Sequence, residues 1–160
     1  MRYHYPDAEA TTALPGPSLA AMSPAPARFT LGITALIFVV VGVGFILVPV
    51  SWAASVEILL PTAMARTDLR ATYGGFDLGF GLFLAACAHR PAWHAPGLHA
   101  AALTLGGFGL TRLAGFFLDG GLDPIMWGLL ALELPAAALC AWLYRREQRQ
   151  GPPSPIAPRG

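Results

Sequence analysis

The stretch that decides the fold runs from Ala65 to Ala88 and reads ARTDLRATYGGFDLGFGLFLAACA. It is apolar enough to cross a lipid bilayer. In a helix, however, Arg70, Tyr73 and Asp77 would share one face, because residues three and four apart stack on the same side. An apolar helix with ionisable side chains on one face needs neighbours that shield them from lipid. The stretch therefore predicts a membrane-embedded bundle whose other helices supply these neighbours.

The composition of the whole chain also indicates a membrane protein. Of its 160 residues, 55% are hydrophobic and 12% are charged, whereas a typical soluble domain has about 25% charged residues. The mean hydropathy is +0.56. The net charge of +1 gives no reason to expect nucleic-acid binding.

The cysteines and histidines do not predict a metal site. Cys87 and Cys140 lie in apolar segments without metal-ligand spacing, so we interpret them as small apolar residues. Three histidines gather between the second and third apolar segments without a zinc spacing, and a solvated loop is the better interpretation. We expect neither a metal nor another cofactor. These histidines are His89, His94 and His99.

Four apolar segments are long enough to cross the hydrocarbon core, which needs about 20 residues at about 1.5 Å per residue. The sequence therefore predicts an all-α, integral membrane four-helix bundle within residues 28–146. Residues 50–61 are too short to span and predict a short interfacial helix around Trp52. The polar, proline-rich ends predict disordered tails at 1–27 and 147–160. The expected spans are about 29–48, 66–88, 97–118 and 124–144.

The first span has a second interpretation as a signal peptide. With a start at Met22, Arg28 would lead the apolar run and Ala53 could lie at a cleavage site. The run is longer than the apolar core of a signal peptide, so we favour a membrane span.

The distribution of arginine predicts the orientation, since the chain contains no lysine. Four spans place both termini on one side, together with Arg28, Arg90 and the arginines that follow Tyr144. The other side carries Arg66 and Arg70, which acidic residues offset. Because positive charge is enriched on the cytoplasmic side, we expect a bacterial inner-membrane protein with both termini in the cytoplasm.

Counting depth from the outer boundary predicts that charged residues from three spans meet. At about 1.5 Å per residue, Arg70 lies about 5 Å deep and Asp77 about 15 Å deep. Arg112 and Glu133 both lie about 10 Å deep. An unpaired charge in lipid would cost several kcal/mol, so we expect these side chains to pair. The predicted polar cluster consists of Arg70, Tyr73, Asp77, Arg112 and Glu133, with Asp68 and Asp119 at its rim.

Small residues at a spacing of four or eight predict close helix packing. We expect this packing within the bundle, with contact to another copy as the alternative. The residues concerned are Gly75 and Gly79 in the second span and Gly107 and Gly115 in the third.

The order and spacing of these residues resemble a known family. The second span carries R-x-x-Y-G-G-x-D from Arg70 to Asp77, and the third carries a G-x-x-R that ends at Arg112. A D-G pair follows at Asp119, and the fourth span holds Glu133. This pattern resembles a family of small bacterial membrane proteins catalogued as a domain of unknown function. The resemblance implies a four-helix membrane domain and no assigned activity.

The predicted polar cluster allows three kinds of function. Internal ion pairs that fix helix packing would make the role structural or one of assembly. A binding site would use Arg70 and Arg112 to hold an anionic or carbonyl group, with Tyr73 orienting it. An intramembrane enzyme or redox accessory would use Arg112 and Glu133 for proton handling. We favour binding of a small amphiphile or of a membrane-protein partner over catalysis.

Overall fold

The computed structural model describes residues 25–120 and 123–149. This part of the chain is helical and contains no β-strand, which confirms the predicted all-α fold with four long apolar helices. Three of these are α1 (Ala25–Leu47), α5 (His94–Asp119) and α6 (Pro124–Arg149). The fourth is continuous and consists of α3 (Ala63–Leu69), a π-helical segment η1 (Arg70–Gly75) and α4 (Phe76–His89). The short elements are α2 (Pro49–Ala54) and a 3-10 turn η2 (Pro91–Trp93).

The helices at both ends extend into the predicted tails. Residues 25–27 belong to α1 and residues 147–149 belong to α6. Pro26 does not prevent this, because proline is tolerated in the first turn of a helix. The rest of the predicted tails, residues 1–24 and 150–160, lies outside the described residues.

Local capping interactions fix where three of the helices begin or end. At the start of α3, Thr62 Oγ1 accepts a hydrogen bond from the N–H of Ala65 at 3.1 Å. At the start of α6, Asp123 Oδ1 accepts one from the N–H of Ile125 at 2.7 Å. Gly120 follows α5 with φ of 72°, a left-handed conformation that glycine adopts without strain. Polar and glycine residues thus end the apolar segments in the places expected from their chemistry.

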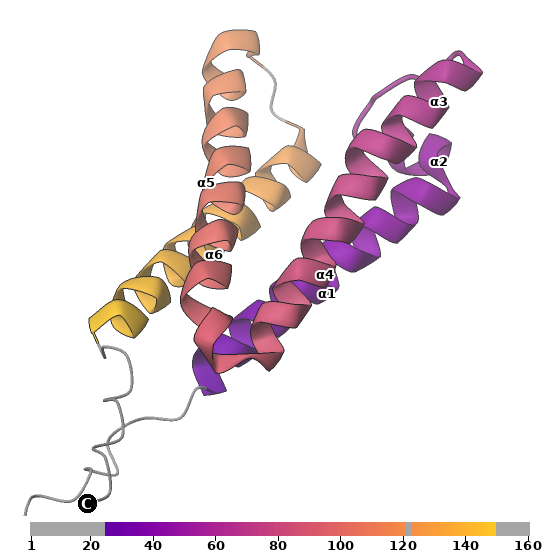
Figure 1. Cartoon of the computed structure of the whole chain (residues 1–160). Coiled ribbons are helices and arrows are strands. Elements are labelled where there is room, and N and C mark those ends of the chain that lie inside the picture. Colours follow the sequence, from indigo (N-terminus) through magenta and orange to yellow (C-terminus); the bar gives the residue numbers. More distant parts are fainter. Residues whose placement is uncertain (1–24, 121–122, 150–160) are drawn as a thin grey trace, which may run out of the picture.

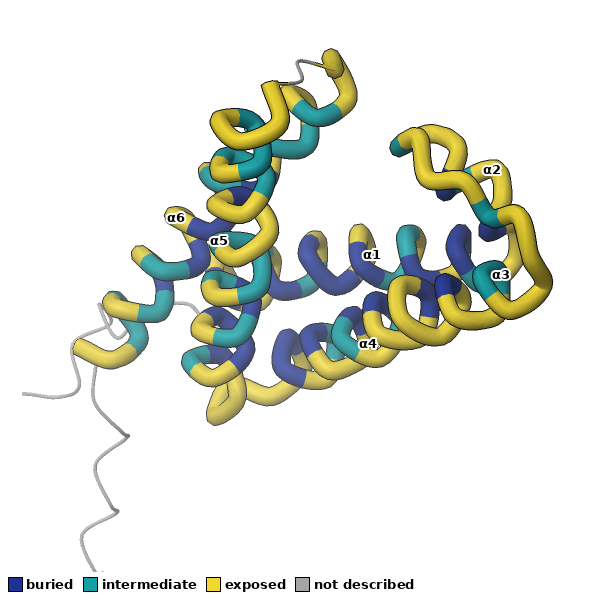
Figure 2. The backbone as a smooth tube through the Cα atoms, turned by 90° about the horizontal axis from the view of Figure 1, so that it is seen from above, coloured by how far each residue is buried: buried dark blue, intermediate teal, exposed yellow. Residues whose placement is uncertain are grey.

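The four long helices are arranged as two antiparallel pairs. The first arm consists of α1 packed against α4, and the second arm consists of α5 packed against α6. Figure 1 shows that the arms meet at one end, the closed end, and diverge toward the other, the open end. Seen from above, the arms remain separate at the open end (Figure 2). The closed end is where α1 and α5 begin and where α4 and α6 end.

The main hydrophobic core lies at the closed end and draws on all four long helices. A second, smaller core of Phe45, Ala53 and Leu69 joins α1, α2 and α3 at the open end of the first arm. The two cysteines lie in the main core as free thiols, which agrees with their interpretation as small apolar residues. The largest fully buried side chains of the main core are those of Leu31, Leu84, Cys87, Leu98, Cys140 and Leu143.

Close packing of α1 on α4 depends on Gly42 and Gly81, which are not among the four packing glycines named from the sequence. A Cβ atom at Gly42 would lie 2.4 Å from the backbone nitrogen of Leu78. A Cβ atom at Gly81 would lie 2.9 Å from the carbonyl oxygen of Ala35. The backbone cannot rotate out of such contacts, so both positions require glycine for the helices to approach this closely.

The predicted packing role of Gly75, Gly79, Gly107 and Gly115 is wrong within this chain. Among the described residues, no atom of another element lies within 4 Å of a Cβ atom at Gly79 or Gly107. At Gly75 and Gly115 the one neighbour found within 4 Å in this part of the chain belongs to the same continuous helix. One residue turns a helix by about 100°, so Gly75 faces away from α1 although its neighbour Gly74 contacts α1.

Candidate functional site

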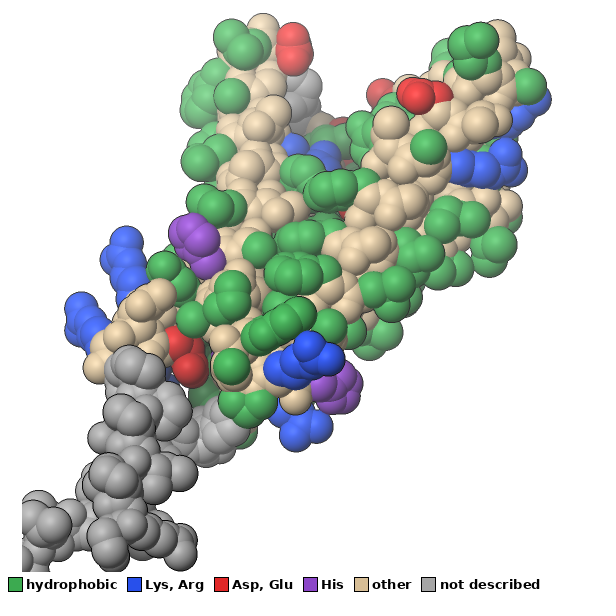
Figure 3. Space-filling view, viewed as in Figure 1, with side chains coloured by type: hydrophobic (Ala, Val, Ile, Leu, Met, Phe, Trp, Pro, Cys, Tyr) green, Lys and Arg blue, Asp and Glu red, His purple; other side chains and the backbone are tan. Residues whose placement is uncertain are grey.

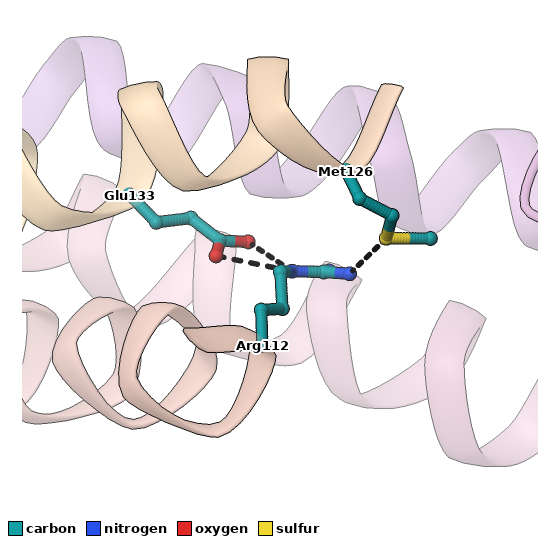
Figure 4. A network of polar contacts seen from close by, with 3 residues as sticks. All are labelled: Arg112, Met126 and Glu133. Carbon is teal, nitrogen blue, oxygen red and sulfur yellow. Dashed lines mark hydrogen bonds and ion pairs between the residues drawn. The ribbon is translucent and has the colours of Figure 1, made fainter. Parts of the chain in front are cut away.

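An ion pair joins the two helices of the second arm. Arg112 Nε donates to both carboxylate oxygens of Glu133, each at 3.1 Å, and Arg112 Nη1 lies 3.4 Å from the sulfur of Met126 (Figure 4). The Glu133 side chain is 8% exposed, whereas the Arg112 side chain is 34% exposed. The arginine therefore neutralises a carboxylate that is almost enclosed, while its own guanidinium group reaches an open space.

Gly109 explains why α6 comes close enough for this ion pair. It lies three residues before Arg112 on α5, and a Cβ atom there would lie 2.6 Å from Leu134 and 3.5 Å from the Cβ atom of Glu133. A larger residue would displace the Leu134 side chain or move α6 away from α5 at the level of the carboxylate. The G-x-x-R pattern thus combines a close helix contact with the charge that pairs across it.

A pocket of about 260 Å³ lies between α5 and α6, on the open-end side of the ion pair. Its α5 residues are Arg112, Gly115, Phe116 and Asp119. On the α6 side it is lined by Asp123, which caps the helix, and by Met126, Trp127 and Leu130. Within each set most neighbours are three residues apart, so each set forms one helical stripe and the two stripes face each other. The pocket therefore has the guanidinium group of the Arg112–Glu133 pair at its base, mainly apolar walls, and two carboxylates where α5 ends and α6 begins.

Arg112 retains hydrogen-bond donors for a ligand in this pocket. Glu133 uses only Nε of the guanidinium group. Nη1 contacts a thioether sulfur, which is a weak acceptor, and Nη2 has no partner among the described residues. The ion pair fixes the guanidinium plane. Among the described residues Nη1 has only a weak acceptor and Nη2 has none, an arrangement suited to the oxygens of a carboxylate or phosphate.

Arg70 and Tyr73 have separate roles on the first arm. Arg70 Nε donates to the carbonyl oxygen of Ile46 at 2.9 Å. This carbonyl belongs to the last turn of α1, where the carbonyl groups lack a partner within the helix. The Tyr73 ring packs on Phe45 with 5.3 Å between ring centroids and is 47% exposed. Both side chains therefore attach η1 to the end of α1 and do not join the ion pair of the second arm.

Asp77 is buried on the first arm, with 7% of its surface exposed. No hydrogen bond or ion pair connects it to another residue within 25–120 and 123–149. The ring of Phe38 packs against Phe80 and Phe108, with 4.9 Å and 6.5 Å between ring centroids, and so connects the two arms. Asp77 lies three residues before Phe80 on α4, and Arg112 lies four residues after Phe108 on α5, so both lie on the open-end side of these rings. The Cα atoms of Asp77 and Arg112 are therefore about 5 Å and about 6 Å from this aromatic layer, measured along their helix axes.

The predicted polar cluster therefore does not exist as one hydrogen-bonded group. Of its seven residues and rim positions, only Arg112 and Glu133 bind each other, and Asp119 lines the pocket beside them. Asp68 is exposed on α3 in the other arm. Counting depth assumed that the helices stay packed along their whole length, whereas the arms diverge. Figure 3 shows the hollow between them, with acidic and basic side chains among hydrophobic ones.

The α6 side of the pocket was not predicted from the sequence. Asp123, Trp127 and Leu130 precede Glu133 at helical spacing, so a stripe extended from the carboxylate toward the start of α6 would have found them. Met126 was also missed, and nothing in the sequence marks a methionine in an apolar helix as a contact of arginine.

The histidines lie at the closed end, far along the helices from the pocket. His94 is 2% exposed and its Nε2 atom lies 3.3 Å from the carbonyl oxygen of Ala88, so the expected solvated loop is wrong for this residue. The pocket itself is therefore lined without a histidine among the described residues.

Comparison with known proteins assigns the chain to a family. A search of the curated proteins and a search of the solved structures each found no match. A family model does match residues 26–144, which cover nearly all of the four long helices and both partners of the ion pair. The chain therefore belongs to the family described as Domain of unknown function (DUF4345), in agreement with the resemblance seen in its sequence pattern.

Proposed function

We propose that this chain is a multipass membrane protein that binds a small amphiphile in the pocket between α5 and α6. The four long helices have 23, 27, 29 and 26 residues and are apolar enough to cross a membrane, and a bilayer core of about 30 Å needs about 20 residues. Large apolar side chains cover their outer surfaces, an arrangement that lipid favours and water does not. Examples more than half exposed are Leu36, Val40, Leu82, Leu103, Leu110 and Leu132.

We further propose that both termini face the cytoplasm of a bacterial inner membrane. The closed end carries Arg28 and Arg90, and three arginines follow at the end of α6, in keeping with the cytoplasmic enrichment of positive charge. The pocket then opens in the outer half of the bilayer. A fusion of green fluorescent protein to the C-terminus should fluoresce and a fusion of alkaline phosphatase should be inactive; the reverse pattern would contradict this orientation.

The observation that supports binding is the state of Arg112. Its guanidinium group is fixed by Glu133 through one nitrogen, yet both of its amino groups lack a strong acceptor and border a pocket. Phe116 and Trp127, with 5.1 Å between their ring centroids, supply an apolar wall next to these donors. An amphiphile would place its acceptor oxygens on the guanidinium group and its hydrocarbon chain along this wall.

Filling the pocket tests this proposal without removing a charge. Gly115 lines the pocket and has only one atom within 4 Å of its Cβ position, so the side chain of Gly115→Leu would occupy the space of a ligand. Gly107→Leu is the matched control, because Gly107 lies two turns earlier on α5 in open space. Leucine favours helix over glycine at both positions.

The measurement is the affinity of the purified protein, in detergent, for a single-chain lipid that carries a phosphate. An uncharged monoacylglycerol with the same chain serves as the comparison ligand. We expect wild type and Gly107→Leu to prefer the phosphate lipid and Gly115→Leu to lose binding by about tenfold or more, since hydrogen bonds to a charged group and apolar contacts are lost together. Equal affinity of all three proteins would contradict the proposal.

A purely structural role is the competing function, and the enclosure of Glu133 favours it. Both carboxylate oxygens accept from Arg112, so the pair satisfies itself across the two helices. If the pair only holds α5 to α6, the phosphate lipid should bind no better than its uncharged counterpart. The two functions therefore predict different results in the same titration.

A further inference from the structure

The charges around the pocket differ between its base and its mouth. Arg112 and Glu133 at the base form a neutral pair. Asp119 and Asp123 line the opposite part of the pocket, where α5 ends and α6 begins. Asp119 follows Arg112 by seven residues, a rise of about 10 Å along α5. The positive donors and the negative acceptors of the pocket thus face a ligand from opposite ends.

The two carboxylates at the mouth are available to a cation. Neither forms an ion pair with any residue of the described segments. Asp123 Oδ1 accepts the capping hydrogen bond from Ile125, which leaves Oδ2 for another donor. Asp119 lies beside Gly115, so no side chain at that position separates it from the interior of the pocket.

This arrangement discriminates against ligands of a single charge. A purely anionic head group would reach the amino groups of Arg112 but would lie near two unpaired carboxylates. A purely cationic head group would meet the carboxylates but leave the donors of Arg112 without an acceptor. A head group with an anionic part inside and a cationic part outside satisfies both ends. Trp127 adds an aromatic ring in the pocket on which an ammonium group is stabilised.

We therefore infer that the pocket selects a zwitterionic amphiphile, in which a phosphate or carboxylate binds Arg112 and an ammonium group binds Asp119 and Asp123. This inference rests on the proposed function, because it names the class of ligand for the same pocket. The apolar chain of the ligand lies along Phe116 and Leu130. The shared chemistry is that of a zwitterionic phospholipid and of its free, water-soluble head group.

The test compares single-chain lipids that share one acyl chain and differ in charge. Lysophosphatidylethanolamine is the zwitterionic probe, lysophosphatidic acid is the anionic probe, and an alkylamine of similar length is the cationic probe. We expect wild type and Gly107→Leu to bind the zwitterionic probe about tenfold more tightly than either of the others, because one charged contact is lost with each alternative. Competition by free phosphoethanolamine would identify the soluble head group as sufficient, whereas its failure would assign the affinity to the lipid.

Isosteric substitution of the carboxylates gives the second part of the test. Asp119→Asn combined with Asp123→Asn removes the negative charge, and asparagine preserves the cap of α6. We expect this variant to fold, to bind the anionic probe more tightly than wild type does, and to lose the preference for the zwitterion. Retention of the preference would overturn the inference.

The possible failures are distinguishable. Anionic and zwitterionic probes that bind wild type equally well, in a manner that Gly115→Leu abolishes, would overturn the charge selectivity and leave the proposed function intact. Absence of binding for all three probes, with no effect of Gly115→Leu, would overturn both.

Discussion

Removing the partners of the Arg112–Glu133 ion pair one at a time should give unequal losses of stability. Arg112→Leu leaves the carboxylate of Glu133, whose side chain is 8% exposed, without the one partner that it has within residues 25–120 and 123–149. Breaking a buried pair in this way costs about 3–5 kcal/mol. Glu133→Leu leaves an arginine whose side chain is 34% exposed and which can turn toward solvent or lipid head groups. For a group exposed to this extent we expect a loss of about 1 kcal/mol.

The double variant should recover most of this loss. Two leucines fit the apolar walls of the second arm, and replacing a buried ion pair by apolar residues is often neutral or stabilising. The two single losses add to about 4–6 kcal/mol, so a double variant that loses about 1 kcal/mol would give a coupling free energy of about 3–5 kcal/mol, at or above the upper end for residues in contact. Thr111→Leu is a matched control, because it adds the same side chain to an exposed position next to Arg112 without touching the pair.

Equilibrium unfolding in mixed micelles with increasing dodecyl sulfate, followed by far-ultraviolet circular dichroism, measures all four variants. Additive effects of the two single substitutions would show that the pair contributes nothing to packing. A larger loss for Glu133→Leu than for Arg112→Leu would refute the reasoning from exposure. Either result would also change the basis of the proposed function, which requires that Glu133 holds the arginine in place.

Three further predictions concern the first arm and use the same unfolding assay. Gly42→Ala should destabilise by about 1–3 kcal/mol, because its Cβ atom would lie 2.4 Å from backbone. Gly79→Ala, whose Cβ atom meets nothing within 4 Å, should be neutral or stabilising; equal effects would contradict the close contact of α1 and α4. Thr62→Ala should cost about 1 kcal/mol through loss of the α3 cap, and Thr62→Ser should restore it. Arg70→Met keeps a long side chain but removes the donor to the carbonyl oxygen of Ile46, and should cost about 1 kcal/mol; no loss would show that the end of α1 is satisfied in another way.

The number and kind of helices could be predicted because they follow from local sequence. Length and apolar character define four spans, and glycine, proline and aspartate mark their ends. The first helix was predicted to begin near Phe29, where the apolar pattern begins, whereas α1 begins at Ala25 because residues 25–27 are also helical. The π-helical segment η1 could not be predicted, since nothing in RATYGG distinguishes it from an α-helical run.

The ion pair could be predicted because charges are rare in apolar helices and have few possible partners. Equal depth on neighbouring spans was enough to connect Arg112 with Glu133. The same reasoning failed for Arg70, which binds a backbone carbonyl of α1. Orphan carbonyl groups occur at every helix end, so a sequence does not show which of them lies beside a given arginine. The sequence does not show how each helix is rotated about its axis either, and glycines that do not contact a neighbouring helix, such as Gly79, were therefore predicted to pack.

The division into two arms has a consequence for how the chain assembles. Each arm is formed by long helices that follow one another in the sequence, so contacts within an arm, such as Gly42 with Leu78, span fewer residues than contacts between the arms, such as Phe38 with Phe108. Less loop entropy opposes the contacts within an arm, so we expect them to form first. The first hairpin, including the contact of Gly42 with Leu78, can form before the residues of the second hairpin have been synthesised. Only the side chains gathered at the closed end wait for all four segments, which makes their burial the last step of folding.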